Sequence, residues 1–254
     1  MHRVLILGGT LEARRLAERL RGRADVALTL SLAGRTATPA AQPVPVRIGG
    51  FGGAEGLAAY LRAERIAALI DATHPYAATI SANAARAATA AGVRLLALRR
   101  PAWQPNAGDR WTEVPDVHAA VQALGPATRR VFLTLGRKEL APFAAAPQHH
   151  YLVRSVDPVD PPLPVPHAIY LLARGPFAET AERELLLAHA IDAIVAKNSG
   201  GEATYAKIAA ARALGIEVIM LRRPPLPAMP SVASIEEAAA WLGHALASVV
   251  ARGV

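Results

Sequence analysis

The densest run of side chains capable of acid–base chemistry in this sequence is Asp71-Ala-Thr-His-Pro-Tyr76. It follows an apolar segment and precedes an alanine-rich one, which places it where a strand ends and a helix begins. There, His74 or Tyr76 could act as a general acid toward a bound ligand. The alternative is helix capping, with Thr73 as the N-cap and Pro75 in the first turn. Capping accounts for those two residues and not for the whole run, so we interpret the run as functional.

A glycine turn, Gly8-Gly9-Thr10, lies between an apolar segment and an amphipathic one near the start of the chain. The pattern predicts a strand, a tight turn and a helix whose N-cap is Thr10. Backbone N–H groups and the positive end of the helix dipole suit a pyrophosphate at such a helix start. The turn does not match Gly-x-Gly-x-x-Gly, so a tight turn that merely needs glycine is an equally good interpretation of this segment alone.

The end of the predicted second strand indicates which dinucleotide the turn would bind. Ser31-Leu-Ala-Gly-Arg35 follows that strand, and no acidic residue occurs between Asp25 and Glu55. Sites that prefer NAD place a carboxylate here, whereas a neutral residue with a nearby arginine accommodates the extra phosphate of NADP. Arg35 can pair with that phosphate and Ser31 can donate to it. A solvated loop arginine is the alternative for Arg35, but together with the glycine turn the pattern favours NADPH.

A second loop that could bind an anion is Lys197-Asn-Ser-Gly-Gly201, with Thr204 and Lys207 one and two turns further on. It also lies between an apolar segment and a predicted helix, where backbone N–H groups favour anions. The turn Gly136-Arg-Lys138 could do the same earlier in this half of the chain. The alternative is that these lysines are solvated charges on helices. For Lys138 and Lys207 this alternative is as good as anion binding, and for Lys197 it is the weaker interpretation.

The sequence lacks the residues that several other kinds of chemistry require. The chain has no cysteine, which excludes disulfides, thiolate nucleophiles and sulfur-ligated metals. No tyrosine has a lysine four residues later, and neither a Gly-x-x-x-x-Gly-Lys-Ser/Thr loop nor a Gly-x-Ser-x-Gly elbow occurs. The pair His149-His150 has no carboxylate at metal-ligand spacing, so we expect no metal.

An internal repeat predicts the elements that position these residues. Residues 66–101 and 191–224 each read as an apolar strand, a polar loop, an alanine-rich helix, a glycine stop, a second strand and Arg-Arg-Pro. The parallel continues, because Val114-Pro-Asp-Val before AAVQALG resembles Val232-Ala-Ser-Ile before AAAWLGH. Such alternation is typical of parallel α/β sheets, whose ligands bind outside the carboxyl ends of the strands. We therefore expect an α/β protein with two Rossmann-like parallel-sheet lobes and a ligand cleft between them.

The expected domains are residues 1–100, binding NADPH, and residues 101–233, on the substrate side. Linkers are expected at 101–115 and 222–233, and the amphipathic closing helix at 234–250 could pack back on the first domain.

Composition favours a globular protein with a small anionic ligand. Of 254 residues, 52% are hydrophobic and 19% charged, and the net charge of +8 comes mainly from arginine. The arginines are scattered and aromatic residues make up only 5% of the chain, so we expect a small polyanion and no nucleic acid. No stretch is long and apolar enough for a transmembrane helix and the start of the chain is no signal peptide, so we expect no membrane and a cytoplasmic location.

Several of these motifs together resemble the precorrin-6A reductase family of cobalamin biosynthesis. They are GGTLEAR, GGFGG, DATHPYA, Gly175-Pro-Phe177, KNSGG and LGIEVIMLRRP, in the same order over essentially the whole chain. The resemblance implies reduction of one double bond of a polycarboxylate tetrapyrrole by a nicotinamide cofactor, without metal or flavin. We also expect transient contact with neighbouring enzymes of the pathway. A cobalt-containing, NADH-using counterpart is the alternative enzyme, against which Arg35 argues, and a two-lobed binding protein without turnover is the alternative class.

The resemblance also implies site residues. The cofactor side comprises Gly9, Thr10, Ser31, Gly34, Arg35, Asp71, Thr73, His74 and Tyr76, to which we add Glu12 and Gly50 from the glycine segments. The substrate side comprises Lys197, Ser199, Gly200, Thr204 and Lys207, to which we add Arg137, Lys138 and Asn198. Relatives often carry aspartate in a KDSG-like loop, and Asn198 in its place puts a proton-donor role for that position in doubt.

Overall fold

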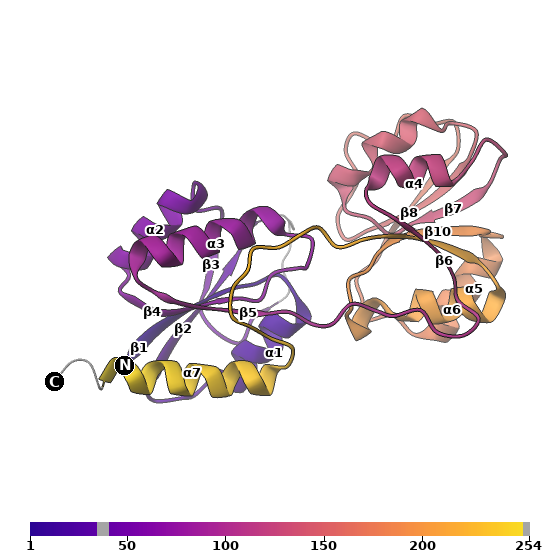
Figure 1. The fold of residues 1–254 in the computed structure, drawn as a ribbon. Helices are drawn as coiled ribbons and strands as arrows, with labels where there is room; N and C mark the ends of the chain where they lie inside the picture. The colour runs from indigo at the N-terminus through magenta and orange to yellow at the C-terminus, as the bar shows by residue number, and fades with distance from the viewer. Residues whose placement is uncertain (35–40, 251–254) are drawn as a thin grey trace. The chain divides into compact units, whose positions relative to one another are not determined.

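Two parallel sheets, each covered by helices, account for the chain in a computed structural model that describes residues 1–34 and 41–250 (Figure 1). The first unit comprises Met1–Pro101 and Pro224–Val254, and the second comprises Ala102–Arg223. The prediction of two parallel-sheet α/β lobes is confirmed.

The first unit has six parallel strands in the order β12-β5-β4-β1-β2-β3. Successive residues of β1 point to opposite faces: Val4 and Ile6 pack with α1 and α7, and Leu5 and Leu7 pack with α2 and α3. This alternation explains why the strand is apolar throughout. The elements are β1 (His2–Leu7), α1 (Leu11–Leu20), β2 (Val26–Leu32), β3 (Val46–Ile48), α2 (Gly53–Ala63), β4 (Ile66–Asp71), α3 (Ala78–Ala91), β5 (Arg94–Leu98), β12 (Ser231–Val232) and α7 (Ile235–Val250).

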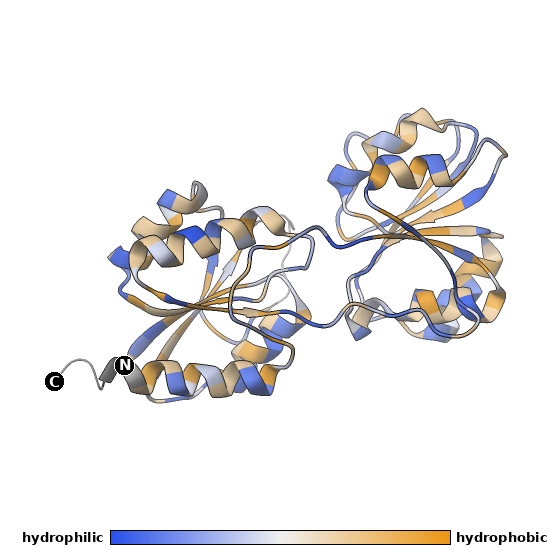
Figure 2. Ribbon diagram, viewed as in Figure 1, coloured by the Kyte–Doolittle hydropathy of each residue, from blue (hydrophilic) through white to orange (hydrophobic). Residues whose placement is uncertain are grey.

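The second unit has the same plan, with the order β6-β11-β10-β7-β8-β9. Phe132 and Ile194 on its inner strands pack with Leu186 of α5 and Ile208 of α6, and in Figure 2 the inner strands of both sheets are largely apolar. The elements are β6 (Arg110–Val114), α4 (Val117–Ala123), β7 (Arg130–Leu133), β8 (His150–Ser155), β9 (Ala168–Leu172), α5 (Glu179–Ala188), β10 (Ala193–Lys197), α6 (Ala206–Leu214) and β11 (Glu217–Leu221), with 3-10 helices at Arg137–Glu139, Ala141–Ala145 and Glu202–Thr204.

The internal repeat corresponds to β4-α3-β5 in the first unit and β10-α6-β11 in the second. After β5 the chain crosses and forms β6, which pairs with β11. After β11 it crosses back and forms β12, which pairs with β5. Each crossing therefore supplies the other unit with the edge strand and helix that complete it.

The linkers are shorter than predicted. Segments 101–115 and 222–233 were expected to be linkers, but β6 occupies the end of the first and β12 the end of the second. Residues 224–233 belong to the first unit rather than to the second, because β12 pairs with β5 there. The closing helix α7 packs against α1, β4 and β5. Both strands lie at sheet edges with polar residues exposed, which gives them little apolar signal in the sequence.

Candidate functional site

The glycine turn after β1 is tight on its inner side and open on its outer side. A Cβ at Gly8 would lie 2.7 Å from Leu30 Cδ1, so the turn packs closely on β2. At Gly9, where φ is +107°, a Cβ would meet no described atom within 4 Å. The backbone of the turn is therefore accessible to a ligand at the start of α1.

Thr10 connects this turn to the end of β4. Its hydroxyl accepts from Ala13 N at 3.1 Å, which confirms it as the N-cap of α1. The same hydroxyl donates to Ala72 O at 2.8 Å. The glycine turn and the acid–base run 71–76 are thus held side by side at one edge of the sheet.

Glu12, in the first turn of α1, forms an ion pair with Arg100 beyond β5. A lone carboxylate here would repel a phosphate, but this pair brings a guanidinium close to the helix start. The negative charge of Glu12 is therefore neutralised by Arg100.

The end of β2 is held by the two neighbouring strands. Ser31 is buried, and its carbonyl accepts from Gly8 N at 2.9 Å. Gly34 has φ of +70°, and a Cβ there would lie 3.3 Å from Ile48. Arg35 lies outside the described residues.

Asp71 organises the polar run from within. It is 2% exposed; its Oδ1 accepts from Thr73 N at 3.2 Å and Thr73 Oγ1 at 2.7 Å, and its Oδ2 accepts from Ser81 Oγ at 2.6 Å. The capping interpretation of Thr73 and Pro75 is wrong, since α3 begins at Ala78 with Ala77 as its N-cap. Thr73 instead binds the Asp71 carboxylate, which fixes the loop between β4 and α3.

His74 and Tyr76 are half-buried, as is Thr73. His74 Nδ1 accepts from Tyr76 N at 3.3 Å, and the two rings lie 5.6 Å apart. Because Nδ1 accepts, the neutral imidazole carries its proton on Nε2.

In the second unit, Lys197 at the end of β10 is paired with Glu139. The other carboxylate oxygen of Glu139 accepts from Gly136 N at 2.8 Å, so one carboxylate joins the loops after β7 and β10. Arg137 lies 3.8 Å from Asp157 and donates to Pro158 O at 3.2 Å, whereas Lys138 is exposed.

The loop after Lys197 turns sharply before α6. Gly200 has φ of +71°, and the hydroxyls of Ser199 and Thr204 lie 3.1 Å apart. A 3-10 helix at Glu202–Thr204 precedes α6, which begins at Ala206.

Lys207 is buried, so its interpretation as a solvated helix charge is wrong. Its Nζ donates to Thr204 O at 2.9 Å and lies 5.5 Å from the Trp103 ring centroid. Burial and the positive charge of Arg154 lower the pKa of Lys207 to about 7, and Glu182 opposes the shift. Arg154 and Glu182 themselves form a buried ion pair.

Asn198 faces the protein interior. Its Oδ1 accepts from Trp103 N at 2.7 Å and its Nδ2 donates to Trp103 O at 2.9 Å. An aspartate could not make the second bond, because an ionised carboxylate has no donor.

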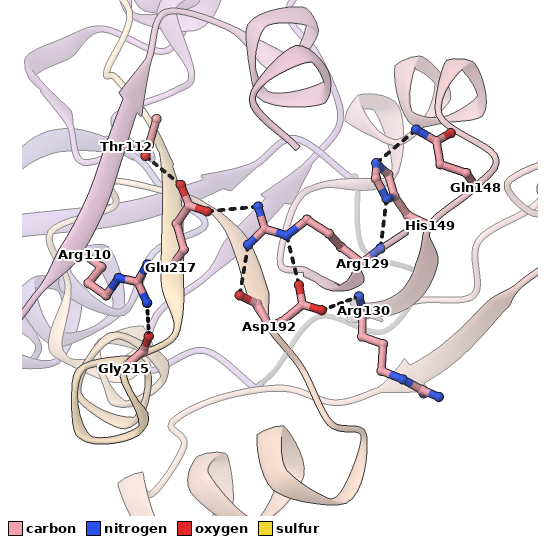
Figure 3. A network of polar contacts seen from close by, with 9 residues as sticks. All are labelled: Arg110, Thr112, Arg129, Arg130, Gln148, His149, Asp192, Gly215 and Glu217. Carbon is pink, nitrogen blue, oxygen red and sulfur yellow. Dashed lines mark hydrogen bonds and ion pairs between the residues drawn. The ribbon is translucent and has the colours of Figure 1, made fainter. Parts of the chain in front are cut away.

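A separate polar network occupies the amino ends of the strands in the second unit (Figure 3). Arg129 binds Asp192 at 3.0 Å and Glu217 at 2.9 Å, and His149 Nδ1 accepts from Arg129 N at 3.2 Å. Burial and the nearby Arg129 charge lower the pKa of His149. Ligands of parallel α/β sheets bind at the opposite edge, so we assign this network to stability.

Within the described ranges, no group of three or more His, Cys, Asp or Glu residues could hold a metal ion. The helices of the described segments include none long and apolar enough to cross a membrane.

Comparison with known proteins shows the family of this chain. A family model described as Precorrin-6x reductase CbiJ/CobK matches residues 3–243. The chain belongs to the precorrin-6x reductase family. The precorrin-6A reductase of Sinorhizobium sp is 59% identical over 245 residues, covering 96% of this chain and 94% of the relative. That of Rhodobacter capsulatus is 52% identical over 242 residues, covering 95% and 96%.

A solved structure of a CobK precorrin-6A reductase shares the fold across both units. It superposes with a TM-score of 0.93 at 51% identity, covering 96% of this chain and 97% of that one. The cobalt-precorrin-6A reductase of Salmonella typhimurium is more distant, at 31% identity over 244 residues and 87% of each chain.

One basic residue of this precorrin-6x reductase, Arg47, was not among the cofactor-side residues predicted from the sequence. Arg47 on β3 is the register partner of Ser31 on β2. Its guanidinium donates to Gly49 O at 2.6 Å and Gly50 O at 2.8 Å and lies 3.7 Å from the Phe51 ring centroid. Its place two residues before the GGFGG motif was the available signal in the sequence.

Proposed function

We propose that this chain reduces one double bond of precorrin-6A with NADPH, giving precorrin-6B in cobalamin biosynthesis. The observation that carries the proposal is the open glycine turn fastened by Thr10 to the acid–base run at the end of β4. A dinucleotide site and a candidate proton donor thereby share one edge of one sheet, in a member of a reductase family.

The first unit fits a nicotinamide dinucleotide. Gly9 and Gly50 each have open space where a Cβ would stand, so the backbone beyond the ends of β1 and β3 can approach phosphates closely. The N–H of Gly49 is already used, since it donates to Leu32 O at 2.9 Å. Thr10 fixes the start of α1 beneath the phosphates. The bound cofactor would supply the hydride.

NADPH is favoured over NADH by the charge at the end of β2. No carboxylate stands at Ser31, and Arg47 is its neighbour in the sheet. A guanidinium beside a neutral residue suits a 2′-phosphate. Arg35, expected there from the sequence, is part of the same proposal.

His74 and Tyr76 are proposed to lie beside the reacting carbon. His74 presents an Nε2–H as a donor because its Nδ1 is occupied by Tyr76 N. Asp71 and Thr73 hold the loop so that these two side chains keep one orientation. Either side chain can orient the nicotinamide amide or deliver the proton that accompanies the hydride.

The second unit is proposed to bind the carboxylates of the tetrapyrrole. Lys197, Arg137 and Lys138 follow its strands at their carboxyl ends, with the hydroxyls of Ser199 and Thr204 nearby. Hydrogen bonds from cationic groups to carboxylates are the strong ones.

The proposal is tested by mixing the purified protein with precorrin-6A and NADPH and following nicotinamide absorbance together with product mass. We expect one NADPH oxidised per macrocycle, a product that gains two hydrogens, and slower reaction with NADH. Parallel reactions with cobalt-precorrin-6A test the alternative enzyme, for which the cobalt substrate would be preferred. Binding of tetrapyrrole without nicotinamide oxidation would leave only a binding protein.

A further inference from the structure

The two Arg-Arg-Pro sequences of the internal repeat lie where the chain passes between the units. The chain leaves the first unit after Pro101 and leaves the second after Arg223. In equivalent positions, Arg99 N donates to Val232 O and Arg222 N donates to Val114 O, both at 2.9 Å. The repeat therefore fastens each departing segment to the edge strand that the other crossing supplies.

The second arginine of each sequence contacts a residue at the candidate ligand-binding edge of its own unit. Arg100 pairs with Glu12 beside the glycine turn. Arg223 Nε donates to Asn198 O, at 2.9 Å, in the loop after β10. These equivalent residues thus tie the departing chain to the ligand-binding edge in both units.

In the second unit, Asn198 joins both crossings to one loop. Its side chain makes the two hydrogen bonds with the backbone of Trp103, two residues after Pro101. Its own carbonyl accepts from Arg223, the last residue before the return. Asn198 is 7% exposed and these bonds are partly buried, which increases the cost of breaking them.

The Trp103 end of this junction is also packed against the second unit. The Trp103 ring meets Tyr205 edge-on at 5.6 Å between centroids and lies 5.5 Å from Lys207 Nζ. A displacement of the loop at Asn198 must therefore either break the hydrogen bonds of Asn198 or move Trp103 and Arg223 with it.

We infer that Asn198 is a positioning residue that couples occupancy of the loop Lys197–Gly201 to both segments connecting the units. This inference rests on the proposed function, in which that loop binds the tetrapyrrole. Asn198 needs its amide for this role, because the side chain must accept from Trp103 N and donate to Trp103 O at the same time.

The test is hydrogen–deuterium exchange of the full-length protein with and without precorrin-6A, in the absence of reduced nicotinamide. Peptides covering 101–105, 197–201 and 220–225 report on the two connections and the loop. Asn198→Ala removes both side-chain bonds, and Asn198→Asp keeps only the acceptor. Asn106→Ala is the matched control, since Asn106 lies in the same connecting segment and bonds Tyr205 OH instead.

In the wild type and in Asn106→Ala, precorrin-6A should slow exchange in the loop and in both connections. In Asn198→Ala the loop should remain protected while the ligand-induced protection of the connections falls about tenfold, with Asn198→Asp intermediate. Equal protection of the connections in all variants would overturn the inference and leave the proposed function intact. An unprotected loop in the wild type would overturn the substrate-side assignment and the inference with it.

Discussion

Lys207 is 5% exposed, with Thr204, Trp103 and the Arg154–Glu182 ion pair around it. It is one of the three lysines of the sequence, and its local sequence does not distinguish it from the exposed Lys138. Burial of an amine depends on what other elements place over it, here Trp103, which enters the second unit far earlier in the chain. For this reason its surroundings could not be predicted from local pattern.

Lys207 should make the stability of the protein depend on alkaline pH. Its pKa is about 7 in the folded protein, against an ordinary value of 10.5, so between those pH values the unfolded chain holds a proton that the folded protein lacks. The free energy of unfolding should therefore rise with pH across that window by about 1.4 kcal/mol per pH unit, relative to Lys207→Met. Denaturant unfolding at several pH values measures this. Lys138→Met removes an exposed lysine and should follow the wild type; a Lys207→Met curve parallel to the wild type would contradict the prediction.

Kinetic measurements can distinguish the two possible roles of His74 and Tyr76, proton donor or nicotinamide clamp. A general acid contributes roughly 10²- to 10⁴-fold to turnover, whereas a nicotinamide clamp acts mainly on cofactor affinity. We expect His74→Ala and Tyr76→Phe to raise the KM for NADPH while turnover at saturation changes by less than about tenfold. A loss of turnover above about 10²-fold with unchanged NADPH affinity would instead make that residue the acid.

At the scale of elements, the sequence predicted the strands and helices that alternate regularly and missed those whose signal is tertiary. The βαβ units of the repeat and the Thr10 cap were predictable because apolar periodicity and capping chemistry are local. The start of α3 was not predictable, because the Asp71 carboxylate accepts hydrogen bonds from Thr73 and Ser81 and the helix begins only at Ala78. The strands β6 and β12 were missed since they are short edge strands, and Arg47 because its relation to Ser31 depends on strand pairing.

The two glycines of the first turn should respond differently to alanine. A Cβ at Gly8 overlaps Leu30 in the core, which predicts a loss of about 1–2 kcal/mol of stability by overpacking. A Cβ at Gly9 meets open space but needs a strained φ, and it would stand where phosphates approach. Thermal unfolding and NADPH titration of both variants test this: Gly9→Ala should lose the larger factor in NADPH affinity. Equal affinity losses would show that the outer face of the turn does not meet the cofactor.

In the whole molecule, the crossings make the second unit one continuous segment of the chain and the first unit two separate segments. All six strands of the second unit lie within Ala102–Arg223, whereas the first unit is completed by β12 and α7 from the end of the chain. In α7, Leu242 and Leu246 are almost fully buried against the first sheet. Their burial contributes roughly 3–6 kcal/mol, a large part of a domain's net stability.

Fragments of the two units should therefore differ in their ability to fold alone. Residues 102–223 are expected to fold cooperatively alone, and residues 1–101 are not. Adding a peptide covering 224–254 to residues 1–101 should restore folding, as seen by circular dichroism and cooperative melting. Cooperative folding of 1–101 without the peptide would contradict the importance assigned to α7.

The proposed reaction transfers a hydride from NADPH to precorrin-6A while a proton arrives separately. A single-turnover reaction in ordinary water, with NADPH carrying deuterium at both C4 positions of the nicotinamide, tests it directly by product mass. We predict a product with one deuterium from the cofactor and one hydrogen from an exchangeable source. Reduced product without deuterium, or no reduced product at all, would contradict the claim.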